Sequence, residues 1–153
     1  MRDAAALFKA LGREARDAGR ELLVQATELV EALSTLKCLG DFILLDIDAV
    51  DRPESFEVAY RLLDRGGEGA AGVFTVKVRA DKADPRLPTA VGVWKAADVL
   101  EREVWDLMGV GFDGRETLHR ILCKDDFEGH PLRKDFIVRP VSRFAESSGE
   151  ARI

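Results

Sequence analysis

Two histidines and a cysteine lie close together near the carboxyl end of the sequence, and side chains of these types could bind a metal ion. Cys123 follows His119 by four positions, and His130 follows Cys123 by seven. A zinc site usually needs four ligands, often in a CxxC or HExxH arrangement, and this group offers three ligands in neither order. The spacing therefore does not favour a metal centre.

The same residues could instead supply a thiol nucleophile and its general base. Such a site also needs donors that stabilise an oxyanion, and no glycine-lined turn near Cys123 offers them. Asp125, Asp126 and Glu128 could form a paired-acid site, but acids in a loop are usually solvated. No complete catalytic constellation results, and this favours a chain that works bound to partners.

The stretch Glu128–Phe136, EGHPLRKDF, combines charge with a rigid proline and has neither a helical nor a strand period. A segment of this kind buries no face of its own, and it gains order by lying on another surface. We interpret its cations as partners for acids that other elements present.

The helix expected from Val93 to Gly109 carries one acid, Glu101, inside its apolar stripe. An unpaired carboxylate there would cost on the order of several kcal/mol or stay protonated. We therefore expect a cationic partner, with Arg133 and Lys134 as the candidates. The alternative is that Glu101 lies at the edge of the stripe in contact with water.

The opposite side of this helix carries Asp98, Arg102 and Asp106 at i, i+4 spacing. Pairs of this kind on a helix surface are weak and solvated. The spacing alone predicts an ordinary solvated face.

Upstream, apolar spacing predicts a helix between Arg20 and Gly40 and a shorter one from Ala4 to Leu11, ended by Gly12. Three alternating segments typical of strands follow. They are Phe42–Val50, Phe56–Leu62 and Phe74–Val78. The connections Asp51–Ser55 and Arg65–Gly72 are too short for a crossover, so the strands should be antiparallel.

The glycine-rich connection lacks the order of a phosphate-binding motif. Asp84–Pro88 holds two prolines and should be an irregular loop. The sequence thus predicts an α+β fold with an N-terminal helix, an antiparallel sheet of three or four strands, one amphipathic helix packed on a face, and an irregular C-terminal arm.

The length of 153 residues and a hydrophobic content of 46% predict one domain over residues 1–140. We expect the tail 141–153 to be flexible or ordered by a partner. The 23 basic residues are dispersed among 28 acids, which argues against nucleic-acid binding. We expect no membrane span, no secretory signal, a cytoplasmic location, and reduced thiols at Cys38 and Cys123.

Three segments together resemble the 30-kDa subunit family of respiratory complex I, which has members in the bacterial NADH–quinone oxidoreductases. They are Glu101–Gly109 (EREVWDLMG), Arg120–Leu122 (RIL) and Glu128–Phe136. The likeness covers roughly residues 40 to 140, and the combination of the helix motif with GHPLRKD is specific.

The resemblance implies a peripheral-arm subunit on the cytoplasmic side of the bacterial membrane, packed against the 49-kDa quinone-site subunit and near the iron–sulfur subunits. It implies no redox cofactor, metal or catalytic residue in this chain, since the iron–sulfur clusters and the quinone site belong to partners. It assigns structural and interface roles to Glu101, Arg102, Glu103, Asp106, His130, Pro131, Leu132, Arg133, Lys134 and Asp135.

One segment departs from the family pattern. Where the family reads GHPDLRR, this chain has Gly114–Arg120, with His119 at a usual arginine position. Related energy-converting hydrogenases and formate hydrogenlyases use a homologous small subunit beside a nickel–iron site. The equivalent subunit of such a complex is therefore the alternative function.

Overall fold

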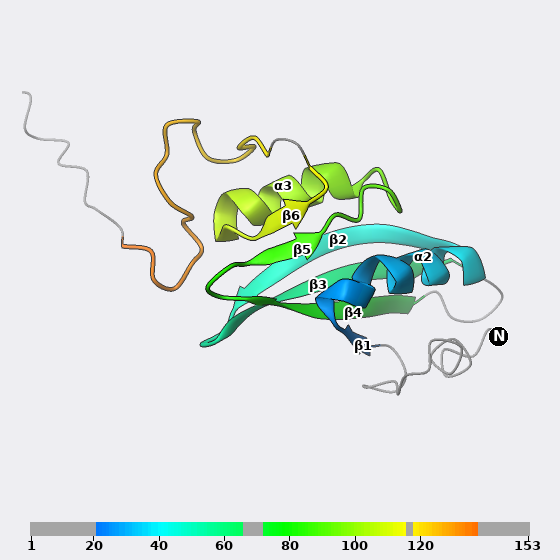
Figure 1. Ribbon diagram of the computed structural model, residues 1–153. Helices are drawn as coiled ribbons and strands as arrows, with labels where there is room; N and C mark the ends of the chain where they lie inside the picture. The colour runs from blue at the N-terminus through cyan, green and yellow to red at the C-terminus, as the bar shows by residue number, and fades with distance from the viewer. Residues whose placement is uncertain (1–20, 66–71, 116–117, 138–153) are drawn as a thin grey trace, which may run out of the picture.

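The computed structural model describes residues 21–65, 72–115 and 118–137, and it has the predicted α+β architecture (Figure 1). The expected helix Ala4–Leu11, the tip of the glycine-rich loop and the tail 141–153 lie outside the described residues. The elements in chain order are β1 (Glu21–Val24), the 3₁₀ turn η1 (Ala26–Glu28), α2 (Leu29–Leu39), β2 (Phe42–Asp51), β3 (Ser55–Asp64), β4 (Gly72–Asp81), β5 (Arg86–Pro88), α3 (Ala97–Met108) and β6 (Gly111–Asp113).

The main sheet has the strand order β1-β4-β3-β2. Strands β2, β3 and β4 form the predicted antiparallel meander. Strand β1 pairs with β4 in parallel, so the sheet is mixed rather than purely antiparallel. The prediction that the first helix begins at Arg20 is wrong, because Glu21–Val24 is a strand and the helix begins at Leu29. The spacing of Leu22 and Val24 also fits a strand, and pairing with β4 decides between the two.

Helices α2 and α3 pack on the same face of the sheet, because their buried residues join those of the strands in one core. Every second residue of β3 and β4 faces this core, and the other face of the sheet is partly exposed. The largest fully buried side chains are Tyr60, Phe56, Phe112, Leu22, Leu29, Leu33, Leu36, Leu62, Leu87, Glu101 and Val58. One acid, Glu101, is thus part of the core.

Two local predictions need correction. Asp84–Pro88 is not entirely irregular, since β5 pairs in parallel with β6. Helix α3 begins at Ala97 rather than near Val93, because Val93 and Trp94 both donate their backbone N–H groups to the carbonyl oxygen of Ala90 in a turn. The helix ends at the predicted place, where Gly109 has a φ of 76°.

Candidate functional site: the arm and the end of helix α3

The buried acid of α3 has a polar setting of its own. Glu101 has 0% exposure, and its two carboxylate oxygens accept hydrogen bonds from the backbone N–H of Ala90 (2.6 Å) and the hydroxyl of Thr89 (2.7 Å). Arg115 adds an ion pair at 3.4 Å. Burial raises the pKa of Glu101, and these three partners offset that rise only in part.

The expected burial of Glu101 and its need for a cation are confirmed, but the predicted partner is wrong. Arg115 reaches Glu101, and it also pairs with Asp98 at the start of α3. Arg133 instead pairs with Asp135 at 2.9 Å, so it belongs to a different part of the surface.

Residues 118–137 form an irregular segment that follows α3 and then leaves it, and we call this segment the arm (Figure 1). Its first part lies along the polar stripe of the helix. Arg102 donates to the carbonyl oxygens of His119 (3.2 Å) and Arg120 (3.3 Å). Asp106 has 0% exposure, so the expectation of an ordinary solvated face fails there.

Asp106 is the main anchor of the arm. One carboxylate oxygen accepts the backbone N–H groups of Ile121 (2.9 Å), Leu122 (2.8 Å) and Cys123 (2.9 Å). The other accepts the guanidinium of Arg120 at 2.6 Å. Burial alone would raise the pKa of Asp106, but these four donors hold it well below its usual range.

Arg120 connects the two halves of the arm to the helix. Its guanidinium lies 5.7 Å from the ring centroids of both Trp105 and Phe127, and it donates to the carbonyl oxygen of Gly129 at 3.0 Å. Cation–π contacts of this kind add to the charge pair with Asp106. The arginine therefore links the outgoing and returning parts of the arm.

The GHPLRKD segment satisfies the last carbonyl groups of α3. His130 donates from Nδ1 to the carbonyl oxygen of Asp106 (2.9 Å), and Leu132 donates its N–H to that of Leu107 (3.0 Å). A Cβ at Gly109 would lie 2.6 Å from the His130 ring, so the close approach requires glycine there. The motif thus caps the helix end.

The end of the same segment is tied to the sheet. The backbone N–H of Lys134 donates to Asp51 at 2.9 Å, and Lys82 pairs with the other oxygen of that carboxylate at 2.5 Å. The Arg133 guanidinium lies 5.2 Å from the Phe56 ring centroid. The hydrogen bond from Lys82 lowers the pKa of Asp51 more than burial raises it, and the N–H of Lys134 lowers it further.

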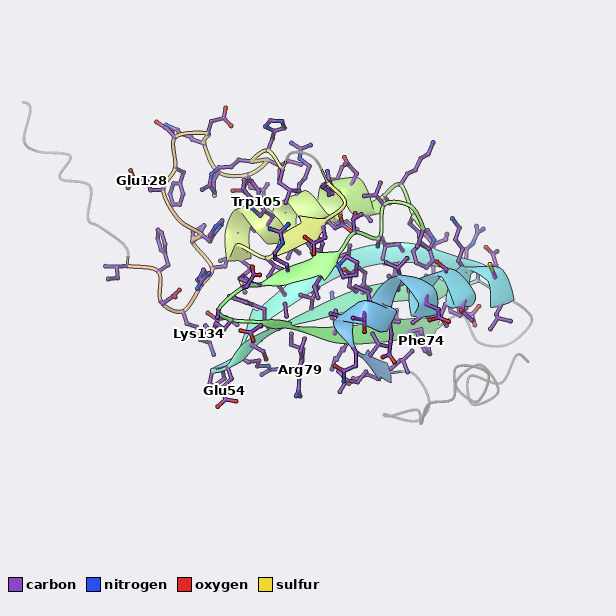
Figure 2. All side chains as sticks on the ribbon, viewed as in Figure 1. Glu54, Phe74, Arg79, Trp105, Glu128 and Lys134 are labelled. Carbon is purple, nitrogen blue, oxygen red and sulfur yellow. The ribbon has the colours of Figure 1, made fainter. Side chains whose placement is uncertain are left out.

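The remaining predicted site residues lie near these anchors. Glu103 and Pro131 are partly buried, whereas the side chains of Lys134 and Asp135 are exposed. Figure 2 shows Glu128 at the outer edge of the arm and Lys134 near the end of the sheet. Of the ten exposed large apolar side chains in the described ranges, four belong to the arm. They are Ile121 (36%), Leu122 (60%), Leu132 (59%) and Ile137 (81%).

The histidine and cysteine side chains considered above as metal ligands or as a nucleophile and its base do not form such a site among the described residues. Within residues 21–65, 72–115 and 118–137, no three His, Cys, Asp or Glu side chains gather closely enough to hold a metal ion. Burial and the neighbouring carboxylate of Asp106 raise the pKa of the Cys123 thiol, which disfavours the nucleophilic thiolate. His130 has one ring nitrogen engaged at the helix end.

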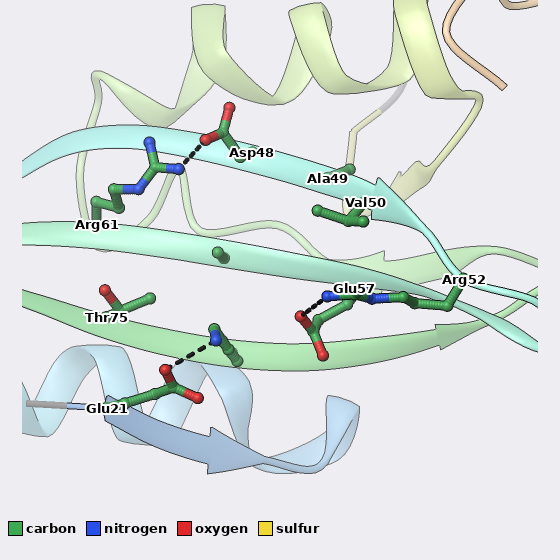
Figure 3. A pocket seen from close by; sticks show the side chains of 10 residues that line it. Glu21, Asp48, Ala49, Val50, Arg52, Glu57, Arg61 and Thr75 are labelled. Atoms are coloured by element: carbon green, nitrogen blue, oxygen red, sulfur yellow. Dashed lines mark hydrogen bonds and ion pairs between the residues drawn. The ribbon is translucent and has the colours of Figure 1, made fainter. Parts of the chain in front are cut away.

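A shallow pocket lies on the partly exposed face of the sheet (Figure 3). Its six charged lining side chains are all paired with one another. The pairs are Glu21 with Lys77, Asp48 with Arg61, and Glu57 with Arg52. Such paired charges stabilise a solvated sheet face and leave no charged side chain of the pocket free for a ligand.

Sequence reasoning missed Arg115, Arg120 and Asp51 as anchoring residues. Asp51 follows a strand and looks like a turn residue, and its partner Lys134 is 83 positions away. Arg115 falls in the segment that departs from the family pattern, and Arg120 begins the RIL segment, to which the resemblance assigned no role. The anchoring roles of Arg115 and Arg120 could have been proposed by asking which cations after α3 can reach its acids.

The only tyrosine of the chain offers a test of the core. Tyr60 is fully buried, and its hydroxyl has no hydrogen-bond partner among the described residues. Burial raises its pKa far above the usual value, and the Glu101 carboxylate adds to that rise. Because an unsatisfied buried hydroxyl is costly, we expect Tyr60→Phe to raise the free energy of unfolding by about 1 kcal/mol.

Urea unfolding monitored by circular dichroism measures this change. Tyr60→Leu serves as the control, because it removes the hydroxyl but also leaves a cavity and should be destabilising by about 2 kcal/mol. A loss of stability in Tyr60→Phe would mean that the hydroxyl has a partner.

Comparisons with known proteins agree on one family. The family described as "Respiratory-chain NADH dehydrogenase, 30 Kd subunit" matches residues 22–142. A subunit of the NADH-quinone oxidoreductase of Moorella thermoacetica is 47% identical over 118 residues, which are 75% of this chain and 78% of the relative. Subunit 5 of the Thermus thermophilus enzyme is 43% identical over 69% of this chain and 56% of the relative. The chain thus spans little more than half the length of the Thermus relative.

Two solved structures share the fold. A trypsin-resistant fragment of Nqo5 aligns with a TM-score of 0.57 and 34% identity, over 64% of this chain and 81% of that one. A chain from the membrane-bound sulfane sulfur reductase, an archaeal respiratory membrane complex, aligns with a TM-score of 0.67 and 33% identity, over 76% of this chain and 71% of that one.

The matched segment, residues 22–142, includes both α3 and the arm. None of the helices in the described ranges is long and apolar enough to cross a bilayer. The chain belongs to the family of the 30-kDa subunit of the respiratory-chain NADH dehydrogenase.

Proposed function

We propose that the protein is a non-catalytic peripheral-arm subunit of a complex I-type NADH–quinone oxidoreductase. In this role it supports assembly and the quinone-site subunit during electron transfer coupled to ion translocation. The observation that carries the proposal is an arm anchored to its own domain by buried carboxylates while its aliphatic side chains remain exposed. Exposed apolar groups on an ordered segment are typical of a protein interface.

The partners that we propose are the 49-kDa-type quinone-site subunit and the iron–sulfur subunits of the same complex, on the cytoplasmic side of the membrane. The iron–sulfur clusters and the quinone site would lie in those subunits. Glu101, Asp106 and His130 would shape the arm from within, whereas the exposed Leu132, Lys134 and Asp135 would face the partner. A role without catalysis fits a chain in which the pKa of the Cys123 thiol is raised by burial and by Asp106, and in which the His130 ring is bonded to the end of the helix.

The second candidate is the equivalent small subunit of an energy-converting hydrogenase or formate hydrogenlyase. The alignment with a chain of the membrane-bound sulfane sulfur reductase keeps this candidate open, because a chain of the same fold occurs in a respiratory membrane complex of another name. The nickel content of the purified complex separates the candidates. Stoichiometric nickel would favour the hydrogenase type, and its absence together with NADH–quinone activity would favour the first proposal.

Purification from the native host tests the proposed function. We expect a tagged full-length chain to co-purify with a large quinone-site or hydrogenase-like subunit, and we expect membranes lacking the chain to lose NADH–quinone reductase activity. The proteins recovered can be identified by native mass spectrometry of the intact complex. A stable monomer without partners, or full activity in membranes that lack the chain, would refute the proposal.

A further inference from the structure

Two of the exposed aliphatic residues of the arm are both anchored to the end of α3 although they are ten positions apart. The backbone N–H of Leu122 is bound to Asp106 at 2.8 Å, and that of Leu132 is bound to the carbonyl oxygen of Leu107 at 3.0 Å. The acceptors belong to neighbouring residues, whose Cα atoms are about 3.8 Å apart. The backbones of both leucines are therefore anchored at the last turn of α3.

The arm near the two leucines is held by several side-chain contacts. The Arg120 guanidinium lies 5.7 Å from the ring centroids of both Trp105 and Phe127 and bonds to Asp106. The ring of Phe127 is in turn stacked on that of Phe136, with 5.8 Å between centroids. Apolar groups that are already ordered lose little entropy on binding, so they contribute efficiently to affinity.

The loop that joins the two leucines is acidic at its outer edge. Asp125, Asp126 and Glu128 are exposed, and Lys124 is the one basic residue among them. Glu128 lies at the margin of the arm, away from the domain (Figure 2). This charge would repel an anionic lipid surface and the same loop of a second copy, and it would attract lysine or arginine side chains.

We propose that Leu122 and Leu132 form a single docking patch, here called the leucine patch, that fits an apolar pocket rimmed by lysine or arginine on a neighbouring protein subunit. The inference rests on the proposed function, since it takes that subunit to belong to the same complex. It adds which two side chains enter the partner, and what the partner surface is made of. The 60% and 59% exposure of the leucines leaves their side chains available for burial.

The test uses the full chain co-expressed with the large subunit of its own complex, and it measures the dissociation constant of the pair. We expect Leu122→Ser and Leu132→Ser each to weaken binding about tenfold, because each loses the burial of one leucine side chain. Val50→Ser is the matched control, since Val50 is 42% exposed on the sheet and outside the arm. It should bind like the unmodified chain. The charge reversal Asp125→Lys with Asp126→Lys should weaken binding further at low salt.

The possible outcomes test the leucine patch and the proposed function separately. If the unmodified chain and both serine variants bind the large subunit equally, the leucine patch is refuted and the proposed function stands. If the unmodified chain does not bind the large subunit, both the leucine patch and the proposed function are refuted. Self-association or binding to anionic vesicles that is lost in the serine variants would assign the patch to a second copy or to a lipid surface, and would overturn the proposed partner. Circular dichroism confirms that each variant is folded.

Discussion

Replacing Asp106 by asparagine is expected to lower the free energy of unfolding by about 3 kcal/mol. The substitution removes the charge that pairs with the largely buried Arg120. An amide group also places N–H donors where the carboxylate now accepts three backbone N–H groups, those of residues 121–123. Urea unfolding gives the free energy, and hydrogen exchange at residues 121–123 reports whether the arm has come loose.

Asp98 provides the matched control for this change. It lies on the same helix and pairs with an arginine, but its side chain is 48% exposed. Exposed pairs contribute little because water screens them, so Asp98→Asn should cost less than about 1 kcal/mol. Equal losses in the two variants would mean that the buried contacts of Asp106 do not anchor the arm.

Lowering the pH should weaken the contacts between Asp106 and the arm in the unmodified protein. The pKa of Asp106 in the folded state is depressed below the ordinary aspartate value of about 3.9. A depressed pKa contributes stability above the unfolded-state value, and that stability is lost as the pH falls through the folded-state value. We therefore expect stability to fall below about pH 4. Asp106→Asn should show a shallower loss, and Asp51 and Asp135, whose pKa values are also lowered, contribute to the loss that remains.

The meander and the end of α3 could be predicted from the sequence because both follow from local patterns. Alternation of apolar residues defines β3 and β4, and a glycine at the position of Gly109 ends a helix. Strand β1 could not be predicted in this way. Its four residues fit either period, and only its pairing with β4, more than 50 positions away, makes it a strand.

In the candidate site, too, the features set by local pattern were predictable and those set by long-range contacts were not. The helical period alone places Glu101 among apolar residues, so its burial and its need for a cation were predictable. The identity of the cation depends on how the chain returns after β6, and no periodicity encodes that path. The burial of Asp106 was not predictable in this way. The helical period places Asp106 on the side of α3 that faces away from the core, and the arm then covers that side. Whether a helix face is exposed to water depends on which other segments of the chain pack on it.

Replacing Glu101 by alanine is expected to lower the free energy of unfolding by about 3 kcal/mol. The variant removes the carboxylate whose two oxygens now accept the backbone N–H of Ala90 and the guanidinium of Arg115. Glu101→Gln keeps the shape and one acceptor oxygen, so it should cost about 1 kcal/mol. Urea unfolding of both variants at neutral pH measures the difference.

The pH dependence of Glu101 should have the opposite sign to that of Asp106. Its folded-state pKa is raised, so its contribution is fully present below the unfolded-state value of about 4.3 and is lost as the pH rises through the folded-state value. Glu101→Gln cannot ionise. Its stability should therefore decline less than that of the unmodified protein as the pH rises above about 4.3.

A double-mutant cycle identifies which arginine neutralises Glu101. Because Arg115 lies 3.4 Å from the carboxylate, Glu101→Gln and Arg115→Met should couple by about 1 kcal/mol. Arg133 pairs with Asp135 instead, so Glu101→Gln and Arg133→Met should be additive within about 0.5 kcal/mol. Coupling to Arg133 and additivity with Arg115 would restore the partner that the sequence suggested, and would require the arm to fold back over α3 differently. The cycle thus tests the path of the chain as well as the ion pair.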